Sequence, residues 1–134
     1  MKISSNSTCS CHSGEKYKKC CQPYHKGILP SNALKLMRSR YCAYALELSD
    51  YIIRTTHGNN PDYTDDLISW RESIDAFSRS TLFNGLTIVE FIDGETISFV
   101  TFEAILNNTP YTEKSRFLNA DGQWLYEKMF LISE

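Results

Sequence analysis

Apolar residues between positions 31 and 80 recur at three- and four-residue steps, which is the spacing of one helix face. The first run predicts an amphipathic helix of about four turns with Ser31 or Asn32 as its N-cap. A short second helix should follow, capped by Ser49, and a third should start near Asp65-Asp66, which suits the positive end of a helix dipole. The two longer stripes are Leu34, Met37, Tyr41, Tyr44 and Leu48, and Tyr63, Leu67, Trp70, Ile74 and Phe77.

After Gly85 the apolar period falls to two, which is the spacing of one strand face. Four strands are predicted, over 86–92, 96–106, 112–119 and 124–130, with turn residues at 93–94, 107–110 and 119–122. Short turns between consecutive strands predict an antiparallel meander. For the last hairpin we expect Phe117 opposite Trp124, because that pairing also sets Glu113 by Lys128 and Lys114 by Glu127.

This register assigns residues to the two faces of the sheet. The face toward the helices should carry Thr87, Val89, Phe91, Val100, Phe102, Phe117, Trp124 and Tyr126. The outer face should mix Ile88, Phe99, Leu118 and Leu125 with Glu103, Lys114, Arg116 and Glu127. A half-apolar outer face is a candidate surface for a homodimer or another partner. Helices followed by an antiparallel sheet predict an α+β fold.

The composition narrows the class of protein. The chain has 134 residues, of which 42% are hydrophobic, and this length is enough to bury one core. No apolar run approaches the roughly 20 residues of a membrane span, and the start MKISSNSTCSC lacks the apolar segment of a signal peptide. We therefore expect a cytoplasmic protein without membrane association. In that reducing compartment, clustered cysteines bind metals or act in redox chemistry more often than they form structural disulfides.

Four of the five cysteines have the spacing C-x-C-x8-C-C and are Cys9, Cys11, Cys20 and Cys21. Two close pairs joined by a loop can complete the four-ligand tetrahedron of a structural zinc site. Disulfides fit less well because adjacent cysteines cannot easily bond to each other, and a redox role stays open although no single thiol is distinguished. We expect one structural Zn²⁺ bound by the four cysteines. His12 and His25 are acceptable substitute ligands, but a full cage needs neither of them.

The charge is distributed unevenly along the chain. Residues 1–26 carry five lysines against one glutamate, a balance of +4, while the remaining nine Lys/Arg and fifteen Asp/Glu give −6. Within the cysteine segment, Lys16, Lys18 and Lys19 can offset the charge of a metal centre or bind an acidic partner. A nucleic-acid partner is weakly supported, because the segment has no aromatic platform on which bases could stack.

The segment CSCHSGEKYKKCC, Cys9 to Cys21, closely resembles the SEC-C motif, a small zinc module named for the C-terminus of the SecA translocation ATPase. The rest of the chain resembles the bacterial YchJ family, also called UPF0225, at LMRSRY (36–41), Ala43-Tyr44, TTH (55–57), SRFL (115–118) and GQW (122–124). Two features depart from the family pattern. His12 stands where the motif usually has glycine, and the chain has no second cysteine motif near residue 134.

The resemblance implies a SEC-C-like zinc-binding motif over 1–26 and a nuclear transport factor 2-like domain over 30–134. That domain is a cone in which three helices pack on a curved four-stranded antiparallel sheet. In SecA the similar module is associated with recognition of the SecB chaperone and the ribosome. The resemblance therefore implies a protein or ribonucleoprotein partner for the zinc module.

Proteins with this cone include isomerases and dehydratases as well as members without any chemistry, so the fold does not decide the function. The candidate pocket residues here are Arg38, Tyr41, His57, Trp70, Glu113, Ser115 and Tyr126. An enzyme would need His57 or Glu113 as a general base, but His57 precedes a glycine and is better explained as a helix C-terminal residue. No catalytic residue is assigned.

Arg38 and Arg40 should point to different sides of their helix, so that at most one of them reaches the pocket. A structural ion pair of either arginine with Glu113 or Glu103 is favoured over anion binding. Cys42, the remaining cysteine, is expected to be a buried small apolar residue.

The leading hypothesis is a non-enzymatic binding or adaptor protein that docks its partner through the basic zinc module. The alternative is a small-molecule binding protein or enzyme that uses the cone pocket. A third interpretation gives the zinc only the role of holding the N-terminal segment on the body.

Overall fold

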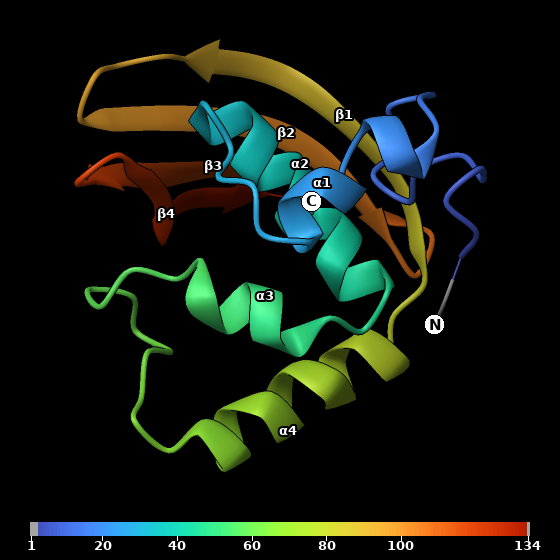
Figure 1. Ribbon diagram of the computed structural model, residues 1–134, viewed down its shortest axis with the longest axis horizontal. Coiled ribbons are helices and arrows are strands. Elements are labelled where there is room, and N and C mark those ends of the chain that lie inside the picture. The colour runs from blue at the N-terminus through green and yellow to red at the C-terminus, as the bar shows by residue number, and fades with distance from the viewer. Residues whose placement is uncertain (1–2, 134) are drawn as a thin grey trace.

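The computed structural model describes residues 3–133, apart from the side chains of residues 131–133 (Figure 1). This range leaves out residues 1, 2 and 134. Besides Lys2, they include the first residue of the predicted unit 1–26 and the last residue of the predicted unit 30–134. The N-terminal segment forms the 3-10 helix η1 (Tyr17–Lys19) and the short helix α1 (Gln22–His25). The body helices are α2 (Ala33–Ala45), α3 (Ser49–Arg54) and α4 (Leu67–Arg79). The strands are β1 (Phe83–Ile92), β2 (Ile97–Leu106), β3 (Thr109–Ala120) and β4 (Gln123–Ser133), in antiparallel order β1-β2-β3-β4.

The predicted α+β fold is confirmed. Capping side chains mark the starts of its two long helices, α2 and α4. The Asn32 side chain accepts a hydrogen bond of 2.9 Å from the Lys35 amide, and Asp66 accepts one of 3.1 Å from the Ser69 amide. Each side chain satisfies an amide that the first helical turn leaves free. Tyr63 lies before α4 rather than on it, because Asp66 is the N-cap. The N-cap of α3 is Leu48, so Ser49, which we expected to be the cap, is the first helical residue.

The predicted register of the last hairpin is wrong by two residues next to the turn and by four at Glu113 and Lys114, because two irregularities shift the pairing between them. Phe117 pairs with Tyr126, and Ala120 pairs with Gln123 across a turn of only two residues. Asp121 and Gly122 both have positive φ, 53° and 88°, as a tight hairpin turn with left-handed residues requires. The expected opposite-charge pairs do not form, since Glu113 lies opposite Ile132 and Lys114 opposite Leu131.

A bulge in β1 changes which of its residues face the helices. The pairing with β2 shifts between Ile88 and Glu90, so one extra residue enters the strand. Ile88 packs against the core, contrary to its expected place on the outer face, whereas Thr87 and Val89 are exposed rather than inward. Phe91 lies on the core side as expected, because the extra residue reverses the inward and outward alternation of the side chains that follow it.

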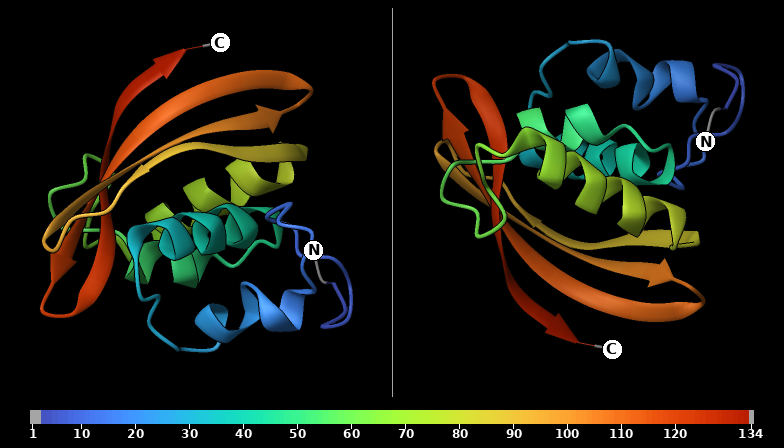
Figure 2. Two further views of the ribbon diagram at one scale, coloured as in Figure 1. Left: turned by 90° about the horizontal axis from the view of Figure 1, so that it is seen from above. Right: turned by 90° about the horizontal axis from the view of Figure 1, so that it is seen from below.

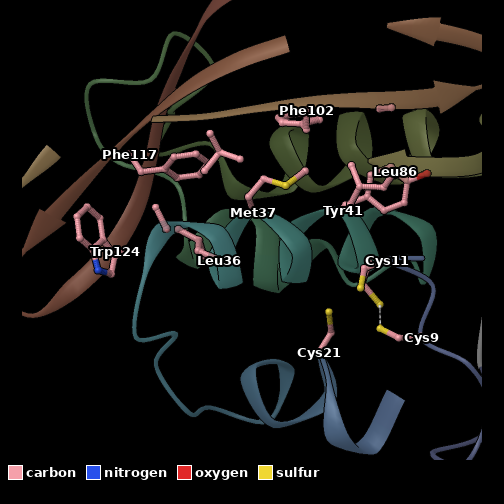
Figure 3. Close-up of a cluster of buried hydrophobic side chains, with 14 of the residues drawn as sticks. Cys9, Cys11, Cys21, Leu36, Met37, Tyr41, Leu86, Phe102, Phe117 and Trp124 are labelled. Atoms are coloured by element: carbon pink, nitrogen blue, oxygen red, sulfur yellow. Dashed lines mark hydrogen bonds between the residues drawn. The ribbon is translucent and has the colours of Figure 1, made fainter. Parts of the chain in front are cut away.

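The curved sheet, the helices and the N-terminal segment form successive layers (Figure 2). The sheet bends around α2, and residues 3–26 lie on the side of α2 away from the sheet (Figure 2). Met37 and Tyr41 point from α2 toward Phe102 of the sheet, whereas Cys9 and Cys21 lie beyond the opposite face of the helix (Figure 3). Because α2 is enclosed between two layers, even its Ser39 and Arg40 are buried.

The N-terminal segment shares the main hydrophobic core of the body. Tyr17 and Cys21 belong to the same buried cluster as Leu36 and Met37 of α2. His25 links the two parts: its Nε2 donates to the Ser39 carbonyl at 2.8 Å, and its Nδ1 accepts from the Tyr17 hydroxyl at 2.6 Å. The segment is therefore packed on the body. Within residues 3–133, no helix has the length and apolar character needed to cross a bilayer.

Candidate metal centre and cone cavity

The N-terminal segment folds back on itself and so brings its two cysteine pairs together. An antiparallel bridge joins Thr8 to Lys16, and the Cys9 amide donates to the Glu15 carbonyl at 2.8 Å. The second cysteine pair follows directly after η1. Positive φ values of 62° at His12 and 87° at Gly14 let the intervening loop reverse direction. His12 therefore adopts the left-handed conformation that glycine usually supplies in the motif.

The four sulfur atoms have the spacing of a tetrahedral thiolate site. All of them lie within 4.8 Å of one another, with 3.5 Å between Cys11 and Cys20 and 3.9 Å between Cys20 and Cys21. Zinc–sulfur bonds of about 2.3 Å imply a sulfur–sulfur edge of about 3.8 Å in a regular tetrahedron. Cys9, Cys11 and Cys21 are buried and Cys20 is half-buried. Cys9, Cys11, Cys20 and Cys21 could therefore hold a metal ion, and we call them the cysteine cluster.

The thiols of the cysteine cluster shift one another's pKa values. Hydrogen bonds from Cys20, Cys21 and Cys9 hold the pKa of Cys11 well below its usual range. The same interactions with Cys11 raise the pKa of Cys20 and Cys21, and raise that of Cys9 to about 11. Because metal-bound cysteines must be deprotonated, a divalent ion would supply the positive charge that the remaining three thiolates need.

Polar groups around the cysteine cluster point at the sulfur atoms rather than completing a ligand set. Arg38 Nη1 donates to the Cys11 carbonyl at 3.3 Å and lies 3.8 Å from its Sγ, and the Ser13 hydroxyl lies 3.2 Å from Cys20 Sγ. Such contacts orient thiolate ligands and offset their charge. His12 Nε2 donates to the Phe83 carbonyl at 3.0 Å, and both ring nitrogens of His25 are already hydrogen-bonded. Neither histidine is needed as a ligand.

A fifth thiol next to the cysteine cluster was not anticipated. Cys42 of α2 is fully buried, as expected, but its Sγ lies 3.7 Å from Cys9 Sγ. It is not one of the four sulfurs that lie mutually within 4.8 Å. No spacing in the sequence could reveal this contact, because it depends on how the N-terminal segment packs on α2.

The three candidate docking lysines lie on the outside of the N-terminal segment. Lys16, Lys18 and Lys19 are exposed, and none of them forms an ion pair within the described part of the chain. Between them Tyr17 is buried and bonded to His25, which fixes the backbone of the turn. The ammonium groups are therefore free to meet another molecule.

A cavity of about 290 Å³ lies between α2 and the concave face of the sheet, and we call it the cone cavity. Four of the seven candidate pocket residues line it: Tyr41, Glu113, Ser115 and Tyr126. Burial raises the pKa of Tyr41 and of Tyr126 to about 12 and also raises that of Glu113. The cone cavity therefore surrounds a few polar groups with largely apolar walls.

The other three candidates do not line the cone cavity. Arg38 points to the cysteine cluster, on the opposite side of α2. His57 lies beyond the end of α3, where its amide donates to the Tyr126 carbonyl of the edge strand and its Nδ1 accepts from the Asn59 amide. Trp70 packs in a second core cluster with Ile74 and Tyr51, because α4 covers α3 there.

Arg40, the other arginine weighed for the pocket, lines the cone cavity instead of Arg38. Its Nη1 donates to Ile52 O, Thr55 Oγ1 and Thr56 Oγ1 at 3.0, 2.8 and 3.0 Å. No carboxylate of the described residues forms an ion pair with Arg38 or Arg40. The expected ion pair of either arginine with Glu113 or Glu103 is therefore wrong.

Comparison with known proteins agrees with these observations. The family model described as "YchJ, middle NTF2-like domain" matches residues 32–129, and the SEC-C motif matches residues 6–23. A UPF0225 protein of Sodalis glossinidius is 35% identical over 129 residues, which cover 90% of this chain and 80% of that protein.

Two solved structures share the whole arrangement. A SEC-C motif containing protein from Rhodopseudomonas palustris superposes with a TM-score of 0.81 at 28% identity, covering 95% of this chain and 100% of that one. A second, from Psychrobacter arcticus, gives a TM-score of 0.79 at 27% identity, covering 92% and 82%. The chain thus belongs to the YchJ (UPF0225) family and combines an NTF2-like domain with an N-terminal SEC-C motif.

Proposed function

We propose that this protein is a non-enzymatic adaptor whose cysteine cluster binds one structural Zn²⁺ and whose exposed lysines dock an acidic protein or ribonucleoprotein partner. Zinc is the ion that four-thiolate tetrahedral sites with short ligand spacings most often hold. Four thiolates complete its coordination, so no open position is left for a reacting water. The proposal therefore assigns the metal a structural role.

The position of the lysines relative to the cysteine cluster carries the docking proposal. Lys18 and Lys19 immediately precede the ligand pair Cys20-Cys21, and Lys16 precedes the buried Tyr17. A bound ion would fix the backbone of this turn and so hold three unpaired positive charges in one arrangement. Preorganised like charges attract an acidic surface at a lower entropic cost than a mobile tail does.

The test compares capture by zinc-loaded wild type with capture by the triple variant Lys16→Glu, Lys18→Glu and Lys19→Glu. Captured proteins are quantified by mass spectrometry, and purified ribosomes are tested separately by co-sedimentation. A docked partner should be lost from the variant and should weaken with salt, because the Debye length shortens from about 10 Å at 0.1 M to about 3 Å at 1 M.

The matched control is Lys35→Glu, Lys114→Glu and Lys128→Glu, which changes the net charge equally outside the N-terminal segment. This control should retain the partner. Equal capture by wild type and by the first variant would contradict docking through these lysines. In that case the metal would only hold the N-terminal segment on the body.

A further inference from the structure

The Arg40 guanidinium is a buried positive charge without a negative partner. Arg40 is 7% exposed, and no described carboxylate lies within ion-pair distance. Its neutral acceptors are at the C-terminal end of α3, where the helix dipole offsets only part of a unit charge. Burying a cation without a full counter-charge is costly, so a structural role alone explains this arginine poorly.

Part of the guanidinium remains available for a ligand. All three hydrogen bonds come from Nη1, so Nε and Nη2 donate to no other described residue. Among the described side chains, the Ser78 hydroxyl is the fully buried polar atom that lacks a hydrogen-bond partner. Because Nε and Nη2 of Arg40 also lack a partner but do not belong to that group, these two nitrogens retain some solvent accessibility. Arg40 lines the cone cavity, and its free donors are the groups that it offers to a ligand there.

Aromatic and carboxyl side chains also line the cone cavity around Arg40. The Arg40 guanidinium lies over the Tyr126 ring, 4.6 Å from its centroid, which fixes its orientation. Phe77, Phe83 and Phe102 supply ring walls. Glu113 and the exposed Asp62 also line the cone cavity, and the Glu113 carboxyl forms no ion pair with a described residue. Burial raises the pKa of Glu113, because the ionised carboxylate is less favoured in these surroundings than in water.

We propose that the cone cavity binds a small organic anion, a carboxylate carried on an apolar or aromatic ring, with Arg40 as the anion-binding group. The ligand carboxylate would supply a counter-charge to Arg40, with which no described carboxylate forms an ion pair, through Nε and Nη2, the pair of donors that a guanidinium offers to two oxygens. The ring would lie against the phenylalanines. At roughly 30 Å³ for each molecule of liquid water, the cavity has room for about ten waters, which suits a single ring with a short acidic group.

Three probes of similar shape and different charge test the ligand class: benzoate, benzamide and benzylamine. Each is titrated into the full-length, metal-loaded chain while amide resonances are followed by NMR. Benzoate should shift the resonances of β3 at residues 113–117, and benzylamine should not. Equal responses to all three probes, or no response to benzoate, would overturn the proposal.

Variants then test the residues. Arg40→Met should weaken benzoate binding at least about tenfold, as expected for the loss of charged hydrogen bonds. Because Arg40 also ties α2 to α3, that variant could lose its fold, so Ala104→Leu serves as a second variant. Ala104 is buried in the cavity wall, and a larger side chain there occupies the ring site with Arg40 intact. Unchanged benzoate binding in a folded Ala104→Leu protein would overturn the assignment to this cavity.

Glu113→Gln distinguishes an anion from a zwitterion. Glutamine keeps the shape of the side chain and removes its acidic proton and its capacity for negative charge. An anionic ligand should therefore bind the variant at least as tightly as wild type. A ligand that pairs an ammonium group with Glu113 would lose affinity instead, and loss of benzoate binding in this variant would contradict the proposed class.

Discussion

The Sγ atoms of Cys9 and Cys42 lie 3.7 Å apart, although 33 residues separate them in the sequence. Cys9 belongs to the cysteine cluster and Cys42 to α2, the helix around which the sheet bends (Figure 2). The contact therefore places the candidate metal centre directly against the central element of the body. Binding or loss of a metal ion at the cysteines should therefore change the stability of the body as well.

Removal of the metal should destabilise the body as well as the N-terminal segment. Tyr17, Cys9, Cys11 and Cys21 share a buried cluster with Leu36, so loss of the metal loosens part of the main core. If this costs about 3 kcal/mol, the melting temperature falls by roughly 10 °C. Calorimetry before and after treatment with a chelator measures the change, and readdition of Zn²⁺ is the control. A body transition that stays at the same temperature would show that the two parts are energetically independent.

Glu113→Gln should stabilise the protein at neutral pH. Burial raises the pKa of Glu113 in the folded state, so the folded state favours the protonated acid. The resulting penalty on the folded wild type is absent below the unfolded pKa of about 4.3 and grows as the pH rises through the folded pKa. Urea unfolding of both proteins at pH 7 and pH 4 should show a gain for glutamine that disappears at the lower pH. The same difference at both pH values would contradict this account.

Glu127→Gln should destabilise the edge of the sheet. Glu127 forms an ion pair with Arg116 and accepts a hydrogen bond from Asn59 of the loop before α4. The Arg116 guanidinium lowers the pKa of Glu127, so its contribution is present at neutral pH and is lost as the pH falls through that lowered pKa. Because both side chains are largely buried, we expect a loss of about 1–3 kcal/mol at pH 7.

Denaturant unfolding checks the Glu127 variant, with Glu90→Gln as control because Glu90 is an exposed carboxylate on β1. The control should change the free energy of unfolding by less than about 0.5 kcal/mol. Similar small effects in both variants would show that the ion pair adds little.

The parts of the structure that depend on local sequence could be predicted. Asn32 caps its own helix three residues on, and the cysteine pairs come together over a loop of eight residues, so neighbours along the chain carry the information. The hairpin register depended on whether Asp121 and Gly122 both adopt left-handed backbone conformations, which the turn composition left open. Next to the turn, where the shift is two residues, Phe117, Trp124 and Tyr126 kept their predicted face, because side chains alternate with a period of two.

Long-range contacts were not accessible from the sequence. Helix geometry required Arg38 and Arg40 to point to different sides of α2, but not which of them meets the cysteine cluster. That choice follows from the packing of α3, because the hydroxyls of Thr55 and Thr56, directly after this helix, accept from Arg40. Cys42 reaches Cys9 for a similar reason, since their contact exists only after the N-terminal segment has folded onto α2.

The predicted partner surfaces remain predictions. On the outer face of the sheet, Phe99 contacts Phe130, and Lys114, Arg116 and Lys128 lie over these two rings. Cations over the rings make this face less apolar than its composition suggests. Sedimentation at increasing concentration would show whether it still supports a homodimer.

Native mass spectrometry of protein purified without chelator tests the central claim most directly. Wild type and Cys42→Ser should each carry one zinc per chain, because Cys42 neighbours the cysteine cluster without being one of its four sulfurs. Cys9→Ser and Cys20→Ser should lose the metal, since each removes a ligand. A metal-free wild type whose mass shows oxidised cysteines would contradict the structural zinc site and favour redox chemistry at these thiols.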